Sequence, residues 1–273
     1  MIKSNCHTHT IYCDGKNTAR EMVEEAVKKG FTSLGFSCHS PMIYDNDWAI
    51  KKEDIPEYIK EINALKYEYQ NTIEIYCGVE VDRDYCHINP EDFDYSIGSV
   101  HQFISNNSIY EIDYTAEKLL SAANDLFDGD IYKMCSEYFN MLADFICSNS
   151  FDVVGHFDLV TKFNEAVPMI DESNSFYQES ALKAIDRILK CKNDIIFEVN
   201  TGAMYRKGNK KPYPAPFIMK HLYDKGAKIT ITSDSHCCES LDFAFDEVYD
   251  YCKSFGFEHA YILKNGRFEK CEI

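Results

Sequence analysis

Histidines and carboxylates recur directly after short apolar runs of this 273-residue sequence. A His-x-His pair follows the first run, an Asp-x-His pair follows a late one, and single residues of the same kinds follow others. Imidazole nitrogens combined with carboxylate oxygens suit zinc, manganese or iron. The candidate metal ligands are His7, His9, Asp14, His39, Glu80, His101, His156, Asp234 and His236.

The spacing of these residues supports a shared site. In extended chain the two members of His7-x-His9, or of Asp234-x-His236, point the same way and can hold one ion or neighbouring ions. Glu80 lies in Gly-Val-Glu-Val-Asp, and an ionisable residue in such a run is costly to bury unless it is paired or metal-bound. His221 and His259 fall outside this pattern and are predicted to be structural or exposed. His87 also falls outside it, in the loop after Glu80, where a substrate contact stays open.

The apolar runs predict strands that alternate with amphipathic helices. The predicted strands cover residues 2–6, 33–37, 73–81, 95–100, 152–155, 195–199, 228–232 and 260–263. The predicted helices between them cover residues 18–30, 54–70, 176–190, 215–225 and 241–255.

Repeated strand–helix units imply parallel strands with right-handed crossovers. Seven or eight units in this length fit one closed (β/α) barrel better than an open sheet. The carboxyl ends of barrel strands open on one face, so ligands far apart in sequence converge there. Residues 104–150 break the alternation with a polar turn and two helical stretches, and we expect them to decorate a single domain over 1–273.

The composition narrows the class of protein. With 28 Lys and Arg against 45 Asp and Glu, the net charge is −17, which disfavours a broad nucleic-acid-binding face. No stretch approaches the ~20 apolar residues of a membrane span, and the N-terminus lacks a signal-peptide core. The twelve cysteines include no CxxC pair and favour reduced thiols. We expect a cytoplasmic protein without membrane or nucleic-acid partners; the sequence gives no oligomeric state.

The ligand segments resemble the motif series of the PHP (polymerase and histidinol phosphatase) superfamily over nearly the whole chain, in the right order. The segments are His7-Thr-His9-Thr with Asp14-Gly15, Cys38-His39-Ser40, Gly78-Val79-Glu80, Gly98-Ser99-Val100-His101, Val154-Gly155-His156 and Ser233-Asp234-Ser235-His236.

This resemblance implies a distorted (β/α)7 TIM-like barrel and a centre of three divalent ions, Zn, Mn or Fe. The implied ligands of one ion are His7, His9, Glu80 and Asp234. A second ion would be held by His101, His156 and the bridging Glu80, and the third by Asp14, His39 and His236.

Within the superfamily, residues 155–164 and 198–206, with Pro212-Tyr213-Pro214, are similar to stand-alone histidinol-phosphate phosphatases. The implied activity is hydrolysis of L-histidinol phosphate, a small phosphorylated substrate, in histidine biosynthesis (EC 3.1.3.15). Asp234, His236 and Arg206 are the expected catalytic residues, and Arg206 and Lys162 the expected phosphate contacts. Lys162 stands where the family carries arginine, so it keeps the charge and loses the bidentate fork.

Other functions remain open at this point. The chain could act on another small phosphomonoester such as a nucleotide, or as a phosphodiesterase or exonuclease, which would need a basic track for the strand. A non-catalytic metal-binding protein on the same barrel is the rival from another class. An incomplete ligand set would favour that rival, and here the set is complete.

Overall fold

The computed structural model describes residues 3–86 and 88–273. Within them, the main sheet has parallel strands in the order β1-β2-β3-β4-β7-β8-β9. The strands are β1 (Lys3–Asn5), β2 (Phe31–Phe36), β3 (Glu74–Asp82), β4 (Tyr95–Ser99), β7 (Val153–Val154), β8 (Ile196–Asn200) and β9 (Lys228–Thr232).

The sheet curls until its first and last strands meet at their carboxyl ends. Thr8 and Ser235 form an isolated parallel bridge just beyond β1 and β9. In it the His9 N–H donates to the Ser235 carbonyl at 2.8 Å and the Ser235 N–H donates to the His7 carbonyl at 3.1 Å. The predicted seven-stranded TIM-like barrel is therefore confirmed, and its closing contacts lie among the candidate ligands.

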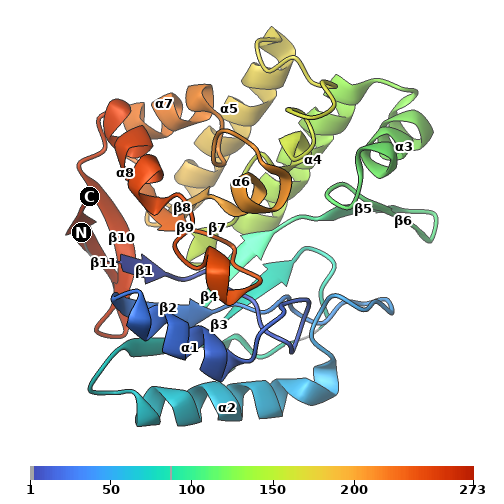
Figure 1. Cartoon of the computed structure of the whole chain (residues 1–273). Coiled ribbons are helices and arrows are strands. Elements are labelled where there is room, and N and C mark those ends of the chain that lie inside the picture. Colours follow the sequence, from blue (N-terminus) through green and yellow to red (C-terminus); the bar gives the residue numbers. More distant parts are fainter. Residues whose placement is uncertain (1–2, 87) are drawn as a thin grey trace.

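Helices connect the strands and cover the outside of the barrel (Figure 1). They are α1 (Ala19–Lys28), α2 (Ile55–Glu68), α5 (Ser175–Cys191), α7 (Pro216–Asp224) and α8 (Phe245–Ser254), with short 3-10 turns at Lys52–Asp54, Pro90–Asp92, Leu159–Thr161 and Cys238–Ser240. Thr18 and Glu21 form a capping box that starts α1. None of the helices in the described ranges is long and apolar enough to cross a membrane.

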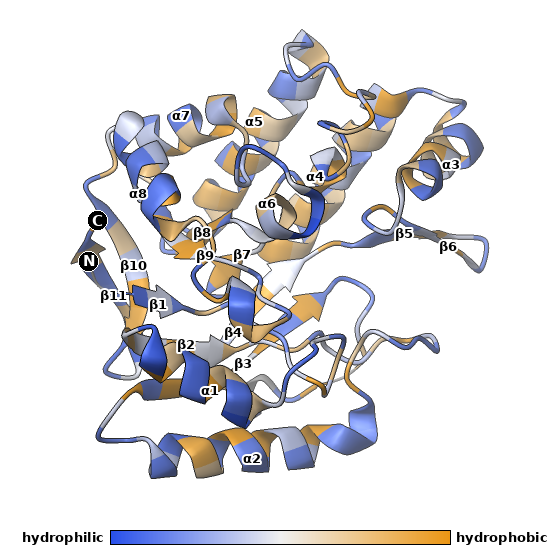
Figure 2. Cartoon of the chain, viewed as in Figure 1, coloured by the Kyte–Doolittle hydropathy of each residue, from blue (hydrophilic) through white to orange (hydrophobic). Residues whose placement is uncertain are grey.

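Hydropathy follows this layered arrangement (Figure 2). Apolar residues run along the barrel strands, whereas polar residues dominate the outer sides of α1 and α2. On α1, Met22, Val23 and Ala26 are buried. The apolar helix face that the sequence predicts thus packs onto the sheet.

The insertion after β4 contains more than its two expected helices. Strands β5 (Gln102–Ser105) and β6 (Ser108–Glu111) form an antiparallel hairpin that precedes α3 (Ala116–Phe127) and α4 (Ile131–Ser148). Its turn places Asn106 and Asn107 in the left-handed region, which asparagine tolerates. The polar turn was predicted, but the strands on either side of it were not.

Two further segments differ from the prediction. The last apolar run is not a barrel strand: β10 (His259–Lys264) pairs antiparallel with β11 (Arg267–Glu272) in a separate hairpin beside both chain ends (Figure 1). Leu263 of this hairpin packs with Tyr95 and Ile97, so it closes the base of the barrel. The segment that carries Arg206, for which no helix was predicted, is the short helix α6 (Gly202–Lys207).

Tyr95 fills the barrel interior below the candidate ligands. Its buried hydroxyl donates to the carbonyls of Cys6, at 2.5 Å, and Phe36, at 3.1 Å. Gly35 and Gly78 on the neighbouring strands leave room for its ring, because a Cβ at Gly78 would lie 2.3 Å from the ring. This packing ties the first four strands together just below the site.

Gly78→Ala should therefore destabilise the barrel by about 1–3 kcal/mol, the usual penalty for overpacking a core. Chemical denaturation followed by circular dichroism measures the free energy of unfolding. Ser121→Ala on the exposed side of α3 is the control and should change it by less than about 0.5 kcal/mol. A Gly78→Ala protein as stable as the control would contradict this view of the core.

Candidate metal centre and its pocket

The nine candidate ligands come together at the carboxyl end of the barrel. His7 and His9 follow β1, His39 follows β2, and Glu80 lies near the end of β3. The remaining ones follow β4, β7 and β9 or, for Asp14, the turn after β1; they are His101, His156, Asp234, His236 and Asp14. An isolated bridge between His39 and Glu80 continues the β2–β3 pairing into the site.

Four atoms form the first group. His7 Nε2 lies 3.2 Å from Glu80 Oε2 and 3.7 Å from Asp234 Oδ1. His9 Nε2 lies 3.7 Å from the same Glu80 oxygen and 3.2 Å from the same Asp234 oxygen. Ligand atoms about 2.1 Å from a tetrahedral ion lie roughly 3.4 Å from one another, so these separations suit one ion.

The second group uses the other oxygen of Glu80. His101 Nε2 and His156 Nε2 lie 3.2 Å apart, and they lie 3.5 Å and 3.1 Å from Glu80 Oε1. The two oxygens of one buried carboxylate thus face two different sets of imidazole nitrogens. This geometry suits a carboxylate that bridges two ions.

The third group lies nearer to solvent. Asp14 places its carboxylate 3.7 Å from His39 Nε2 and 3.1 Å from His236 Nε2. The His9 ring stacks on the His236 ring with their centroids 4.1 Å apart, which joins this group to the first. The Asp14 side chain is 37% exposed, so this group is open to the pocket.

Several buried polar atoms of the cluster lack a hydrogen-bond partner within residues 3–86 and 88–273. Among the described residues, the buried atoms without a hydrogen bond include His7 Nε2, His9 Nε2, His39 Nδ1 and Glu80 Oε2. Buried polar atoms nearly always have a partner. Unpaired imidazole nitrogens directed at an unpaired carboxylate oxygen are the donor set of a divalent metal ion, so these residues fit such ions.

Charge inside the cluster is balanced by its own members. Burial raises the pKa of the Glu80 carboxyl, but positive charge on His7, His39 and His101 outweighs burial and holds that pKa well below its usual range. Burial lowers the pKa of His101, whereas Glu80 and Asp82 raise it, to about 9. The site therefore favours an ionised Glu80 among positive neighbours, the state in which a carboxylate binds a metal ion.

Arg206 holds the chain at Asp234. One of its terminal nitrogens donates to the Asp234 carbonyl at 2.5 Å, and the other donates to Asp234 Oδ2 at 2.7 Å. Asp234 has φ +47°, a left-handed conformation unusual for a residue other than glycine. Gly202 makes the contact possible, because a Cβ there would lie 2.7 Å from Arg206.

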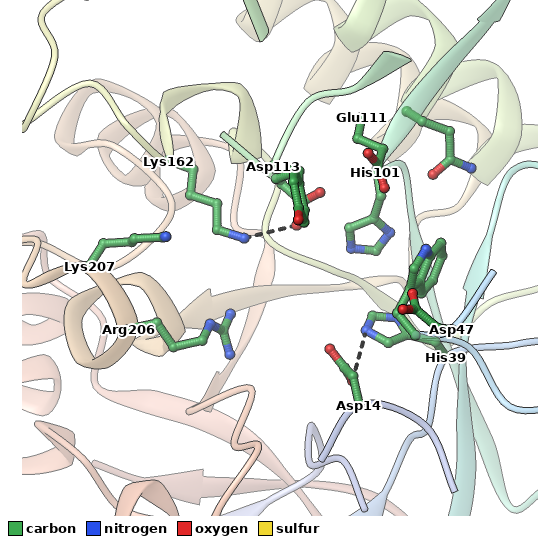
Figure 3. Close-up of a pocket in the computed structure, with 12 residues that line it drawn as sticks. Asp14, His39, Asp47, His101, Glu111, Asp113, Lys162, Arg206 and Lys207 are labelled. Atoms are coloured by element: carbon green, nitrogen blue, oxygen red, sulfur yellow. Dashed lines mark hydrogen bonds and ion pairs between the residues drawn. The ribbon is translucent and has the colours of Figure 1, made fainter. Parts of the chain in front are cut away.

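A pocket of about 330 Å³ opens over the cluster (Figure 3). Lys162, Arg206 and Lys207 line one side of it, and His39, Asp47 and Glu111 line the other. Its lining includes Lys162, Arg206, Lys207, Asp47, Trp48, Glu111, Asp113 and Tyr114 beside Asp14, His39 and His101. Lys162 pairs with Asp113 at 2.9 Å. Trp48, in the loop between β2 and α2, forms part of the wall.

Comparison with known families agrees with this arrangement. The sequence profile of the PHP domain matches residues 5–202, nearly three quarters of the chain. The chain belongs to the PHP domain family. The match includes seven of the nine candidate ligands and ends at the start of α6.

Relatives match over almost their whole length. A Deinococcus radiodurans protein named "Probable histidinol-phosphatase" is 29% identical over 92% of both chains. The histidinol-phosphatase of Bacillus subtilis is 28% identical over 92% of this chain and all of its own. The structure of Lactococcus lactis histidinol phosphate phosphatase, complexed with zinc, L-histidinol and phosphate, has a TM-score of 0.71 at 21% identity and covers 99% of this PHP chain.

The sequence analysis did not identify two carboxylates that contact the candidate ligands. Glu198, in β8, lies 2.5 Å from His7 Nδ1 and accepts a hydrogen bond from the His156 backbone at 2.6 Å. Asp82, at the end of β3, lies 2.8 Å from His101 Nδ1. Such partners orient metal-binding imidazoles and raise their basicity. The signal that marks Glu80, an ionisable residue in a β-branched run, also marks Glu198 and could have found it.

The histidines outside the pattern differ from the cluster. His221 on α7 contacts Asp186 at 2.8 Å on the outside of the barrel, and His259 begins β10. His87 lies outside the described residues. Neither described histidine lines the pocket.

The bridging position of Glu80 predicts a loss of metal on substitution. Glu80→Gln removes the charge that faces two groups of imidazoles, so the purified variant should contain fewer ions per chain than the wild type. Elemental analysis measures this, with His221→Ala as the matched control that should keep the wild-type content. If the two variants hold the same amount of metal, Glu80 is not a ligand.

Proposed function

We propose that this chain is a metal-dependent phosphomonoesterase that hydrolyses L-histidinol phosphate to L-histidinol and inorganic phosphate. The observation that carries the proposal is the charge separation in the pocket over the ligand cluster. A substrate with a phosphate at one end and positive charge at the other matches this pattern, and histidinol phosphate has that shape.

The cationic side of the pocket suits the phosphate. Arg206 and Lys207 come from α6, and Lys162 comes from the turn after β7 (Figure 3). Arg206 also adjoins Asp234 and His236, at 2.7 Å and 2.9 Å, so a phosphate that it contacts lies beside the candidate ligands. Lys162 forms an ion pair with Asp113. We therefore propose that it supplies positive charge near the phosphate without binding the phosphate oxygens in a fixed geometry.

The acidic side suits the ammonium and imidazole of histidinol phosphate. Glu111 ends β6, and Asp47 and Trp48 lie on the loop after β2. Burial and the neighbouring Asp113 raise the pKa of Glu111, so a bound cation would stabilise its charge. Trp48 meets the His39 ring edge-on with centroids 5.0 Å apart, and such an indole can pack on a cationic ring.

The relatives support the same substrate. Proteins that match this chain over nearly their full length are named histidinol-phosphatases. The Lactococcus lactis structure of the same fold contains zinc, L-histidinol and phosphate.

We assign three divalent ions to the three ligand groups, of Zn, Mn or Fe. When bound, such ions neutralise phosphate charge and lower the pKa of a bound water to near neutrality. Glu80 would hold two of them together through its two oxygens. The buried imidazoles would keep their Nε2 atoms directed at the ions because Glu198 and Asp82 hold the opposite ring nitrogens of His7 and His101.

Asp234 and His236 are the groups placed to accept or return a proton. Asp234 Oδ1 lies 3.5 Å from His236 Nδ1, and the two side chains are 7% and 17% exposed. Arg206 fixes both, because one of its nitrogens reaches the Asp234 carbonyl and His236 Nδ1. We propose that Arg206 contributes by binding phosphate and by holding this pair.

Phosphate release from a panel of substrates tests the assignment. The panel contains histidinol phosphate, nucleotides, a phosphodiester and single-stranded DNA. Histidinol phosphate should give the highest kcat/KM. A nucleotide or diester that exceeds it would overturn the substrate and leave the metal centre standing, whereas no hydrolysis of any ester would favour a non-catalytic metal-binding protein.

Metal removal should abolish turnover. Protein treated with a chelator and freed of it should not release phosphate, and Zn, Mn or Fe(II) should restore activity, because the charge on the phosphate is otherwise left uncompensated. Elemental analysis verifies the removal. Full activity in verified metal-free protein would rule out the mechanism.

The two ends of the pocket should respond differently to substitution. Glu111→Gln should lower kcat/KM for histidinol phosphate about tenfold, the effect of losing roughly 1.5 kcal/mol from a hydrogen bond to a charged group, and spare p-nitrophenyl phosphate. Arg206→Ala should impair both substrates alike. Glu117→Gln, on the exposed start of α3, is the matched control and should change neither. Equal losses on both substrates with Glu111→Gln would place the cationic end elsewhere.

A further inference from the structure

The imidazoles of the cluster are held from behind by unlike partners. His7 and His101 each direct Nδ1 at a carboxylate, that of Glu198 at 2.5 Å and that of Asp82 at 2.8 Å. His9 directs Nδ1 at the sulfur of Cys13, 3.5 Å away. His9 therefore has a soft, weakly accepting partner where His7 and His101 have a charged one, while the buried Nδ1 of His156 has no hydrogen-bond partner in the part of the chain that the structure describes.

The position of Cys13 is fixed by the turn that carries Asp14. The N–H groups of Cys13 and Gly15 both donate to the Thr10 carbonyl, at 3.0 Å and 3.1 Å, so the chain folds back over His9. A Cβ at Gly15 would lie 2.6 Å from the His9 backbone, and only glycine allows this approach. The sulfur is thus brought to the His9 ring by backbone constraints.

The neighbours of its two ring nitrogens indicate how the His9 ring is oriented. Nε2 has no hydrogen-bond partner and lies 3.2 Å from Asp234 Oδ1 and 3.7 Å from Glu80 Oε2, so its lone pair faces the ligand cluster. Nδ1 then carries the hydrogen, and the acceptor within reach is Cys13 Sγ. Asp14 Oδ1 is farther from Nδ1, at 3.8 Å.

We propose that Cys13 is the positioning residue of His9, and that its sulfur makes His9 a weaker ligand of its ion than a carboxylate partner would. A carboxylate behind an imidazole orients the ring and raises its basicity, and loss of such a partner costs 10- to 100-fold in metal affinity. A thiol orients the ring and adds little basicity. The inference rests on the proposed metal centre and not on the substrate.

Metal retention at equilibrium tests this role without reference to activity. Zinc-loaded full-length protein is dialysed against graded concentrations of a chelator, and the zinc remaining per chain is measured by elemental analysis. Cys13→Ala should release one fraction of its zinc at an about tenfold lower chelator concentration than wild type does, and should retain the remaining zinc as wild type does.

Cys13→Asp places behind His9 the kind of partner that His7 and His101 have. Cys13→Asp should hold the zinc bound through His9 more tightly than wild type does. If Cys13→Ala fails to fold, as judged by circular dichroism, the comparison of Cys13→Asp with wild type decides alone. Glu198→Gln removes the partner of His7, which belongs to the same ligand group as His9, and should weaken the same fraction. Cys252→Ala, which alters a buried thiol on α8 far from the cluster, should change nothing.

Retention by Cys13→Ala that equals wild type, or retention by Cys13→Asp that is no tighter, would overturn the proposal. These outcomes are separate from a failure of the proposed function. A protein that hydrolyses no histidinol phosphate but shows this order of zinc retention still supports the role of Cys13.

Discussion

A buried carboxylate surrounded by imidazoles is the constraint on which this structure depends. Glu80 is 1% exposed, and each of its oxygens faces nitrogens from different strands. Burying an isolated carboxylate is prohibitively expensive, so this arrangement is stable only with positive charge on several sides. Imidazoles provide that charge and the proposed ions would add to it, so the residues that compensate the buried carboxylate are the ones proposed to bind metal.

The barrel supplies the geometry that this carboxylate requires. Parallel strands deliver their carboxyl ends to one face, and the Thr8–Ser235 bridge closes the ring within the ligand segments themselves. Tyr95 below and the Arg206–Asp234 contact beside the cluster fix its floor and one wall. The backbone hydrogen bonds, the packed core and the candidate ligands adjoin one another, so a substitution in one of them displaces the others.

Much of this could be read from the sequence. Two patterns are visible in the sequence alone: the i, i+2 pairs, and the placement of His39, His101 and His156 after apolar runs. Both depend only on residues that lie close together along the chain. The barrel followed from the alternation of short runs with capped helices such as α1. The strand order and the single face were then consequences of handedness and of parallel pairing.

The parts that the sequence did not reveal depend on neighbours distant along the chain. Asp82 matters because a ring nitrogen from the next strand lies 2.8 Å away. The last apolar run became a cap at the base of the barrel, since its partner strand is polar and carries no strong signal of its own. The helix α6, which carries Arg206, was not predicted, because it is only six residues long. Its arginine contacts Asp234, which is distant along the chain.

Anomalous X-ray diffraction from crystals of the metal-loaded protein would test the central claim most directly. We expect three anomalous-difference peaks at the carboxyl end of the barrel. The Glu80 carboxylate should lie between two of them, and the third should lie beside Asp14, His39 and His236. Peaks that leave Glu80 without a metal contact, or that lie outside this cluster, would contradict it.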